Sequence, residues 1–324
     1  MINYKEGDFM EEKARIHLDE RIFLIDGFDL GVASRTGTYV IQEEELTLIE
    51  TGPSPSVKYI KKGLATLGLS LEQVKYIIVT HIHLDHAGGA GVLIKECPNA
   101  KVVVHPRGER HLEDPTKLTA GAKAVYGDSF SELFDPVLPI EKERLIVKSE
   151  GDTLKIGPDC TLEFLDTPGH AKHHFSVYDP ISNGVFTGDT VGIRYEQLEK
   201  DGIHLFLPST SPNHFNPNDM DASIKRIEKM NVDRIYFGHF GMTEFPNKAL
   251  KQVAEWLEVF MEEAEHVVAE KKGYDDLSKR LLQRVKEHLR ELGVPDEHEV
   301  YILINLDMQV SSLGIIDYFK KLKQ

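Results

Sequence analysis

A group of metal-binding side chains directly after a short apolar run places the strongest constraint on how this chain can fold. Residues 76–79 are Tyr-Ile-Ile-Val, a run typical of a buried β-strand, and the four metal-type residues that follow are His81, His83, Asp85 and His86. Imidazole nitrogen and carboxylate oxygen are the donors that hold Zn²⁺ and similar ions. At the extended end of a strand, side chains two residues apart point in the same direction, so His81 and His83 can bind one ion. Asp85 and His86 lie beyond the strand and can turn toward a second ion, so the sequence predicts a metal site at this strand end.

Three later strand-like segments also end on a ligand-type side chain beside a glycine. His170 follows Asp-Thr-Pro-Gly, Asp189 follows Phe-Thr-Gly, and His239 follows Tyr-Phe-Gly. Glycine lets the backbone turn tightly after a strand, and loops at strand ends carry much of the binding chemistry of proteins. Each of these residues is therefore a candidate ligand.

Taken in order, these motifs resemble those of the metallo-β-lactamase superfamily. The ligand pattern is similar to the seven-ligand, two-metal version of that family, and it consists of His81, His83, Asp85, His86, His170, Asp189 and His239. Thr51-Gly52 also resembles the family's early strand-end motif, and the similarity covers about residues 20–245. The resemblance implies an α+β fold, an αβ/βα four-layer sandwich, for the catalytic part of the chain.

The resemblance also implies how the ligands are shared between two divalent metal ions. The first ion would be held by His81, His83 and His170, and the second by Asp85, His86 and His239, with Asp189 bridging both. Three imidazoles leave an open position for water, as a catalytic zinc site requires. Zn²⁺ is the expected ion, with Fe or Mn as alternatives because these donors accept several metals.

The function predicted from this resemblance is that of a dinuclear metallo-hydrolase. A metal-bridging hydroxide, with a pKa of roughly 7, would attack an ester, lactone or thioester carbonyl. Asp85 would be a proton shuttle to the leaving group as well as a ligand. Oxygen-reducing di-iron members of the family carry glutamate where His83 stands, so His83 favours hydrolysis over redox chemistry.

Within the superfamily, the chain is similar to the glyoxalase II and lactonase-like branches. A glutathione thioester is less favoured than other substrates, because no matched basic pair follows His239. Two alternatives remain open. The first is a phosphodiesterase or ribonuclease of the same fold, and the second is a non-catalytic superfamily member.

Two segments are predicted to border the substrate. Residues 106–150 lengthen the interval between the metal loop and His170. One interpretation of this insertion is a lid or a pocket wall, and the other is an additional surface helix. Residues 204–215, rich in Pro, Ser and Thr, form either a loop over the metals or a rigid surface turn. The pocket interpretation selects Tyr195, Phe206, His214 and Phe215. His174, four residues after His170, is predicted to support a ligand rather than to bind metal itself.

Composition limits the partners and the compartment. Lys and Arg total 38 against 53 Asp and Glu, which gives a net charge of −15. This charge disfavours binding to nucleic acid, because such binding needs a surface rich in Lys and Arg. We therefore expect a small-molecule substrate. The sequence has no membrane-length apolar run and no signal-peptide pattern, and its two cysteines, Cys97 and Cys160, show no zinc or redox spacing. We expect a cytoplasmic protein with no membrane partner.

Residues 1–245 are predicted to form the catalytic domain and residues 246–324 a helical C-terminal extension. Apolar residues at helical spacing predict helices over 248–272 and 276–292. A last helix would be capped by Ser311 or Ser312, and residues 300–306 are ambiguous between helix and strand. The extension is predicted to pack over the domain or to mediate a homodimer.

Overall fold

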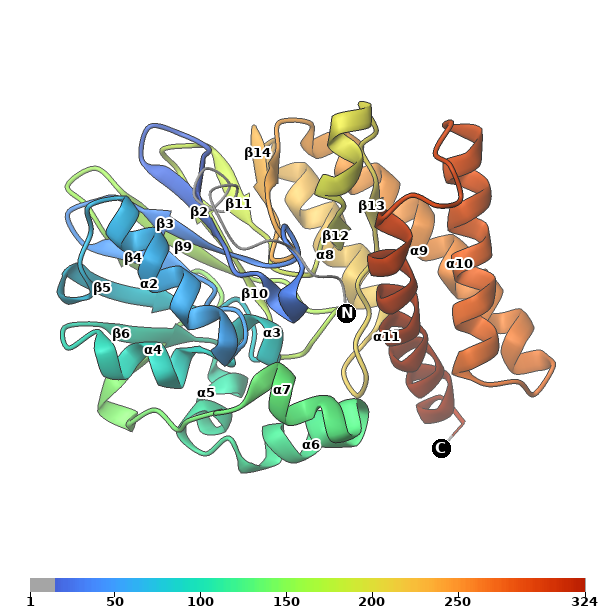
Figure 1. Cartoon of the computed structure of the whole chain (residues 1–324), viewed down its shortest axis with the longest axis horizontal. Helices are drawn as coiled ribbons and strands as arrows, with labels where there is room; N and C mark the ends of the chain where they lie inside the picture. Colours follow the sequence, from blue (N-terminus) through green and yellow to red (C-terminus); the bar gives the residue numbers. More distant parts are fainter. Residues whose placement is uncertain (1–14, 324) are drawn as a thin grey trace. The chain divides into compact units, whose positions relative to one another are not determined.

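The computed structural model describes residues 15–323, which form two compact units (Figure 1). Among these residues, unit 1 comprises 15–165 with 177–182, and unit 2 comprises 166–176 with 183–323. The predicted ligands are divided between the units. The four of the metal loop belong to unit 1, and the three later ones belong to unit 2.

A seven-stranded sheet with its strands in sequence order is the centre of unit 1. Its strands are β1 (Arg15–His17), β2 (Ile22–Asp26), β3 (Gly37–Ile41), β4 (Leu46–Ile49), β5 (Val74–Ile78), β6 (Lys101–Val104) and β7 (Leu145–Val147). The pairs from β1 to β4 are antiparallel, whereas those from β4 to β7 are parallel. Ile49 at the end of β4 pairs with Ile78 at the end of β5, so the residues that follow both strands share one edge.

Two helices of unit 1 pack on this sheet (Figure 1), namely α2 (Val57–Thr66) and α4 (Ala90–Glu96). They contribute Ile60, Leu64, Leu93 and Ile94 to the core that also contains the strand residues Leu48, Ile77 and Val102. Two further strands lie mainly in unit 1, namely β8 (Thr153–Lys155) and β9 (Thr161–Asp166), and they pair antiparallel. Strand β10 (Phe175–Asp179) has residues in both units.

Capping differs at two helix starts of unit 1. Ser56 precedes α2 but makes no side-chain capping bond, and a 3₁₀ turn, Ser54–Ser56, leads into the helix. Ser70 and Gln73 form a capping box at the short 3₁₀ helix Leu71–Gln73.

The segment 106–150 folds into three α-helices and two 3₁₀ helices, followed by strand β7 of the sheet. The α-helices are α5 (Pro106–Glu113), α6 (Thr116–Tyr126) and α7 (Phe130–Phe134). Phe130 and Phe134 of α7 form a small apolar cluster with Leu84, which belongs to the metal loop. The segment therefore packs directly on the loop that carries the unit 1 ligands.

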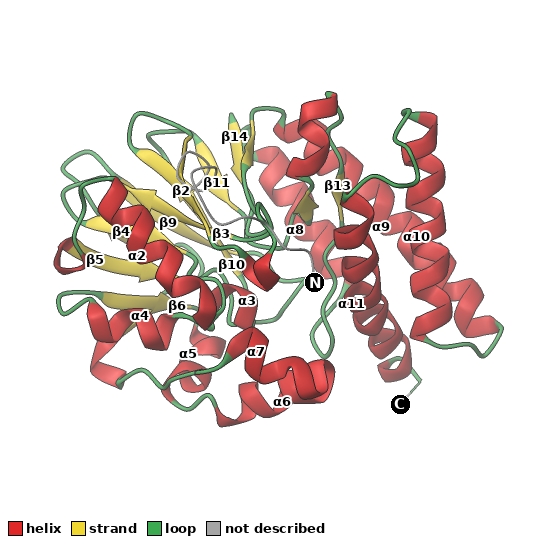
Figure 2. Cartoon of the chain, viewed as in Figure 1, coloured by secondary structure: helices red, strands yellow, loops and turns green. Residues whose placement is uncertain are grey.

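Unit 2 is built from short strands and the α-helices α8 to α11 (Figure 2). Its elements are β11 (Gly184–Phe186), β12 (Ile193–Arg194), β13 (Phe206–Leu207), α8 (Pro217–Lys229), β14 (Arg234–Tyr236), β15 (Met242–Thr243), α9 (Pro246–Ala269), α10 (Tyr274–Glu291) and α11 (Val300–Lys321). Strand β14 is parallel to β11 and antiparallel to β15, and β12 pairs antiparallel with β13. The parallel pair brings the loops after β11 and β14 to one edge.

The C-terminal region is helical, as predicted, and α9, α10 and α11 pack on one another (Figure 2). One detail of the expectation is wrong. Helix α11 already starts at Val300, so Ser311 and Ser312 lie inside it as buried residues and do not cap it. The ambiguous residues 300–306 are helical because they bury apolar side chains on several sides of one long helix. A domain boundary at residue 245 stays a prediction.

Helix α11 is also long and apolar enough, by length and composition alone, to cross a membrane. Of the most apolar stretch of this helix, 61% is buried within the protein, as in a helix of a protein core. Among residues 15–323 it is the one helix with these properties.

A close approach between α4 and the segment after α7 generates a stability prediction. A Cβ atom added to Gly91 would lie 2.0 Å from the carbonyl oxygen of Leu138, whereas one added to Gly121 of α6 would meet no atom within 4 Å. We expect Gly91→Ala to lower the free energy of unfolding by about 1–3 kcal/mol through overpacking. Gly121→Ala is the control and should raise it by roughly 0.5–1 kcal/mol. Denaturant titration measures both, and equal effects would contradict the close approach.

Candidate metal centre

In unit 1, the metal loop follows β5 and ends in a one-turn helix. Helix α3 (Leu84–Ala87) begins after His83, which occupies the N-cap position, so Asp85 and His86 lie in its single turn. The His81 ring centroid is 4.6 Å from that of His83 and 4.2 Å from that of His86. Three of the four predicted ligands of this loop are thus clustered imidazoles.

Glu50, which follows β4, lies beside these imidazoles although the sequence analysis did not select it. Its carboxylate is buried, its Oε1 atom accepts a hydrogen bond from the Thr80 hydroxyl, and Oε1 is 3.6 Å from His86 Nδ1. Glu50 has a φ of 67°, a left-handed conformation that costs a non-glycine residue about 1–3 kcal/mol. The parallel pairing of β4 and β5 delivers the side chain to this position.

The hydroxyl of Thr80 fixes the orientation of His81. Because Thr80 donates its only proton to Glu50, its contact of 3.1 Å with His81 Nδ1 requires that nitrogen to carry the proton. The lone pair of His81 is then on Nε2, the atom that would bind a metal. The backbone of His86 is held as well, because the Thr51 amide and hydroxyl both donate to its carbonyl, each at 2.9 Å.

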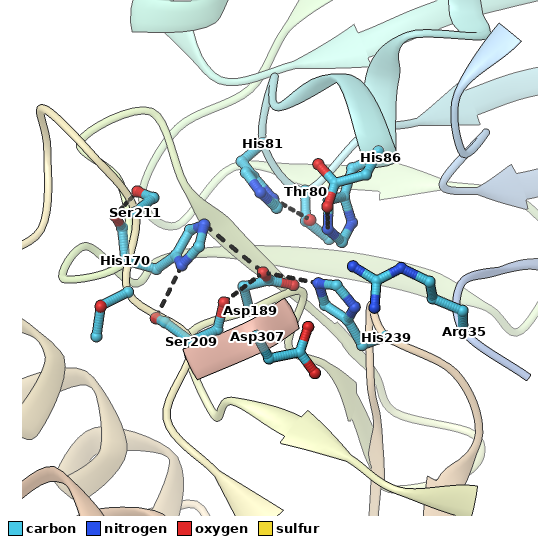
Figure 3. A network of polar contacts seen from close by, with 12 residues as sticks. Arg35, Thr80, His81, His86, His170, Asp189, Ser209, Ser211, His239 and Asp307 are labelled. Carbon is cyan, nitrogen blue, oxygen red and sulfur yellow. Dashed lines mark hydrogen bonds and ion pairs between the residues drawn. The ribbon is translucent and has the colours of Figure 1, made fainter. Parts of the chain in front are cut away.

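In unit 2, the carboxylate of Asp189 lies between two imidazoles (Figure 3). Its Oδ2 atom is 3.6 Å from His170 Nε2 and 3.2 Å from His239 Nε2, and all three side chains are buried. Asp189 follows β11 and His239 follows β14, and the Gly238 amide donates to the Gly188 carbonyl at 3.1 Å. The parallel strand pair therefore brings the two loops together.

His170 reaches the same group through a turn that only glycine can make. Gly169 has a φ of 133°, and a Cβ atom there would lie 2.3 Å from the Met220 backbone. His170 Nδ1 donates to the Ser209 carbonyl at 2.9 Å, which leaves its lone pair on Nε2 (Figure 3). The Ser209 hydroxyl donates to Asp189 Oδ2 at 2.9 Å, so one residue positions two candidate ligands.

His174 lies behind Asp189 in the same unit. Its Nε2 atom accepts a hydrogen bond of 3.2 Å from the Asp189 amide, and its Nδ1 atom contacts the hydroxyls of Thr167 and Thr190 at 3.0 and 3.1 Å. The ring is buried, and its centroid is 6.2 Å from that of His170. These contacts hold the backbone that carries Asp189.

The donors of each unit fit divalent metal ions. Imidazole and carboxylate groups together are the donor set of zinc, iron and manganese sites. In unit 1, one ligand atom from each of Glu50, His81 and His86 lies within 4.8 Å of the others. Glu50 Oε2 is buried, and among residues 15–323 it has no hydrogen-bond partner, so a cation beside it would offset the cost of its burial.

Comparison with known proteins identifies the family. The profile of the metallo-β-lactamase superfamily matches residues 33–239. The chain belongs to the metallo-β-lactamase superfamily. A metallo-β-lactamase fold-containing protein of Sulfurisphaera tokodaii is 28% identical over 208 residues, 63% of this chain and 72% of that protein. Hydroxyacylglutathione hydrolase of Legionella pneumophila is 26% identical over 147 residues, 45% of this chain and 42% of that protein.

Solved structures agree on the fold. A metallo-β-lactamase family protein from Thermus thermophilus superimposes with a TM-score of 0.66 at 18% identity, over 95% of each chain. The resemblance and the fold class drawn from the sequence are thereby confirmed. The chain has the metallo-β-lactamase fold, with mixed sheets and helices and a helical C-terminal region. The chain is a metallo-hydrolase of this superfamily, and its fold implies that it binds divalent metal ions.

The four side chains predicted to line a pocket lie in unit 2 of this superfamily member, and three of them are buried. The Tyr195 hydroxyl donates to Asp307 at 2.9 Å, the Phe206 ring stacks on Phe237, and Phe215 contacts Tyr318. The His214 ring centroid lies 5.0 Å from that of His173. Their role toward a substrate stays a prediction.

The two cysteines of this superfamily member are buried. Burial raises the pKa of Cys97 to about 12, and burial together with the neighbouring Asp179 carboxylate raises that of Cys160 to about 12. Both thiols are therefore protonated at neutral pH. A thiolate is the nucleophilic and metal-binding form of cysteine.

Sequence reasoning missed Glu50 and Ser209. Glu50 directly precedes Thr51-Gly52, so the early strand-end motif was a signal for it. Ser209 carries no such signal, because it acts through a carbonyl and a hydroxyl that any loop serine possesses.

The contacts of Glu50 generate a prediction about metal affinity. We expect Glu50→Gln to weaken metal binding about 10–100-fold, because the outer partners of ligating histidines contribute that much. Glu44→Gln removes the same charge from an exposed position and should leave the affinity unchanged. Competition with a chromophoric chelator measures both variants. Equal affinities for Glu50→Gln and the wild type would contradict the role given to Glu50.

Proposed function

We propose that the chain is a dinuclear metal-dependent hydrolase that cleaves carboxylic ester, lactone or thioester bonds of a small molecule. The observation that carries the proposal is the placement of the Asp189 carboxylate between His170 Nε2 and His239 Nε2, at 3.6 and 3.2 Å. A carboxylate with an imidazole on either side suits a ligand shared by two ions.

The proposed ligand sets follow the order of the superfamily motif. We assign His81, His83 and His170 to one ion, Asp85, His86 and His239 to the other, and Asp189 to both. The hydrogen bonds within each unit support the assignment, because they place the lone pairs of His81 and His170 on Nε2, the atom that would bind a metal. Zn²⁺ is the proposed metal. Bound divalent ions lower the pKa of water to roughly 7 and polarise a carbonyl oxygen.

Asp85 is proposed to carry the proton to the leaving group as well as to bind metal. Its side chain is 24% exposed, whereas that of Asp189 is 3% exposed, so Asp85 can exchange protons with a substrate or with water. General acid–base groups of this kind contribute about 10²–10⁴-fold to a rate.

Two observations favour a carbonyl substrate over a phosphodiester. The net charge of −15 disfavours a nucleic-acid substrate, and one relative is named for the hydrolysis of a thioester. That relative matches less than half of either chain, so the class of bond is proposed rather than a single substrate. We further propose a cytoplasmic location, with no nucleic-acid or membrane partner. The C-terminal helices α9–α11 either mediate a homodimer or serve only as packing.

A substrate panel tests the class of bond. We expect the zinc- or manganese-loaded chain to hydrolyse at least one of a lactone, an aryl ester and a thioester faster than bis-p-nitrophenyl phosphate. A chelator should abolish the turnover, and the added metal should restore it. Strong phosphodiester turnover without carbonyl activity would establish the alternative, a phosphodiesterase or ribonuclease.

Replacement of the proposed proton carrier tests the mechanism. Asp85→Asn should lower kcat about 10²–10⁴-fold, and its metal content shows how much of the loss comes from the lost ligand. Asp128→Asn, at an exposed position between α6 and α7, should retain wild-type kcat and metal content. Full activity with full metal content in Asp85→Asn would refute both roles of Asp85.

A further inference from the structure

Helix α11 packs against the short segment that positions two of the proposed ligands, and both belong to unit 2. The segment is residues 209–211, which we call the support segment. The Thr210 hydroxyl donates to the Ser311 carbonyl of α11 at 2.7 Å, and the Thr210 amide lies 3.5 Å from the Ser311 hydroxyl. Thr210 and Ser311 are 1% and 2% exposed, so these bonds are shielded from water.

A glycine of α11 allows this close approach. A Cβ atom added to Gly314 would lie 2.7–2.8 Å from the backbone atoms of Ser211. Contacts under 3.0 Å with backbone cannot be relieved by a side-chain rotation, so any larger residue must displace the helix or the support segment.

The support segment contacts the ligands with its other groups (Figure 3). Ser209 accepts from His170 Nδ1 and donates to Asp189 Oδ2, each at 2.9 Å. The Ser211 hydroxyl donates to the His170 carbonyl at 2.7 Å. Thr210 lies between these two residues, so its backbone cannot move without moving the partners of both ligands.

Further bonds join α11 to both sides of the support segment. On one side, Tyr195 donates to Asp307 at 2.9 Å. On the other, the Asn213 amide donates to Asp317 at 3.1 Å, and Lys321 donates to the Asn213 carbonyl at 2.7 Å. All three partners on α11 lie outside residues 33–239, the part of the chain that the family profile matches.

We propose that α11 is a positioning element of the metal centre. The positioning residues are Ser311 and Gly314 of α11 and Thr210 of the support segment. The helix holds the support segment in register, so that Ser209 keeps the His170 lone pair on Nε2 and orients the Asp189 carboxylate. This inference rests on the proposed role of His170 and Asp189 as ligands. It assigns metal retention to a helix that contributes no ligand of its own.

Metal affinity in matched variants of the full chain tests the proposal. Thr210→Val removes the hydroxyl with little change of volume, and Thr210→Ser restores it. Gly314→Ala introduces the close contact, and Gly121→Ala is its control in a helix where a Cβ atom has open space. Ser312→Ala removes a buried hydroxyl of α11 that has no hydrogen-bond partner among residues 15–323. Each zinc-loaded protein is titrated with a chelator, and thermal unfolding of the same samples verifies the fold.

We expect Thr210→Val and Gly314→Ala to bind zinc about 10-fold more weakly than the wild type, at the lower end of the range for groups that orient ligands. Thr210→Ser, Gly121→Ala and Ser312→Ala should bind it as the wild type does. If Gly314→Ala does not fold, the comparison of Thr210→Val with Thr210→Ser decides. Wild-type affinity in folded Thr210→Val, or an equal loss in Ser312→Ala, would overturn the proposal.

The same experiment separates this proposal from the proposed function. A wild-type chain that holds zinc and responds to the Thr210 variants, yet cleaves none of the substrates in the panel, contradicts the hydrolase proposal and supports the role of α11. A wild-type chain that hydrolyses an ester supports the hydrolase proposal. If Thr210→Val and Gly314→Ala then retain zinc as the wild type does, the role of α11 is contradicted. A wild-type chain that takes up no zinc, manganese or iron overturns both.

Discussion

Parallel strand pairing is the constraint on which the candidate ligand groups of both units depend. In unit 1, the pairing of β4 with β5 brings Glu50 to the histidines of the metal loop, and in unit 2 the pairing of β11 with β14 brings Asp189 to His239. Parallel strands end at a common edge, so residues far apart in the sequence become neighbours there. The turns that follow the strands then aim the side chains.

Burial explains why these donors have such well-defined partners. A buried imidazole or carboxylate is costly unless its polar atoms are satisfied, and each satisfied atom also fixes an orientation. Thr80 contacts His81 Nδ1, and Ser209 accepts from His170 Nδ1, so both rings present Nε2. The same hydrogen bonds that lower the cost of burial therefore prepare the rings to bind a cation. Helix α11 extends this arrangement by holding the support segment from outside the region that the family profile matches.

The last helix differs from the sequence expectation because its buried apolar residues extend it. Ser311 and Ser312 have the residue type of helix caps, but the apolar residues 300–306 extend α11 past them and bury both inside the helix. Phe206 and Phe215 each pack against another aromatic ring of unit 2, and their role toward a substrate stays a prediction. Residue type indicates what a side chain can do, whereas its neighbours decide which of those roles it can take.

The sequence by itself determined the family, the fold class and the residues proposed as ligands, because these depend on local patterns such as an apolar strand followed by closely spaced histidines. Tertiary structure alone decided which groups orient those residues. Glu50 and Ser209 reach the histidines only through strand pairing and loop packing, and Gly314 is required only because the Ser211 backbone lies against α11. Such contacts join positions that are distant along the chain, and no local pattern records them.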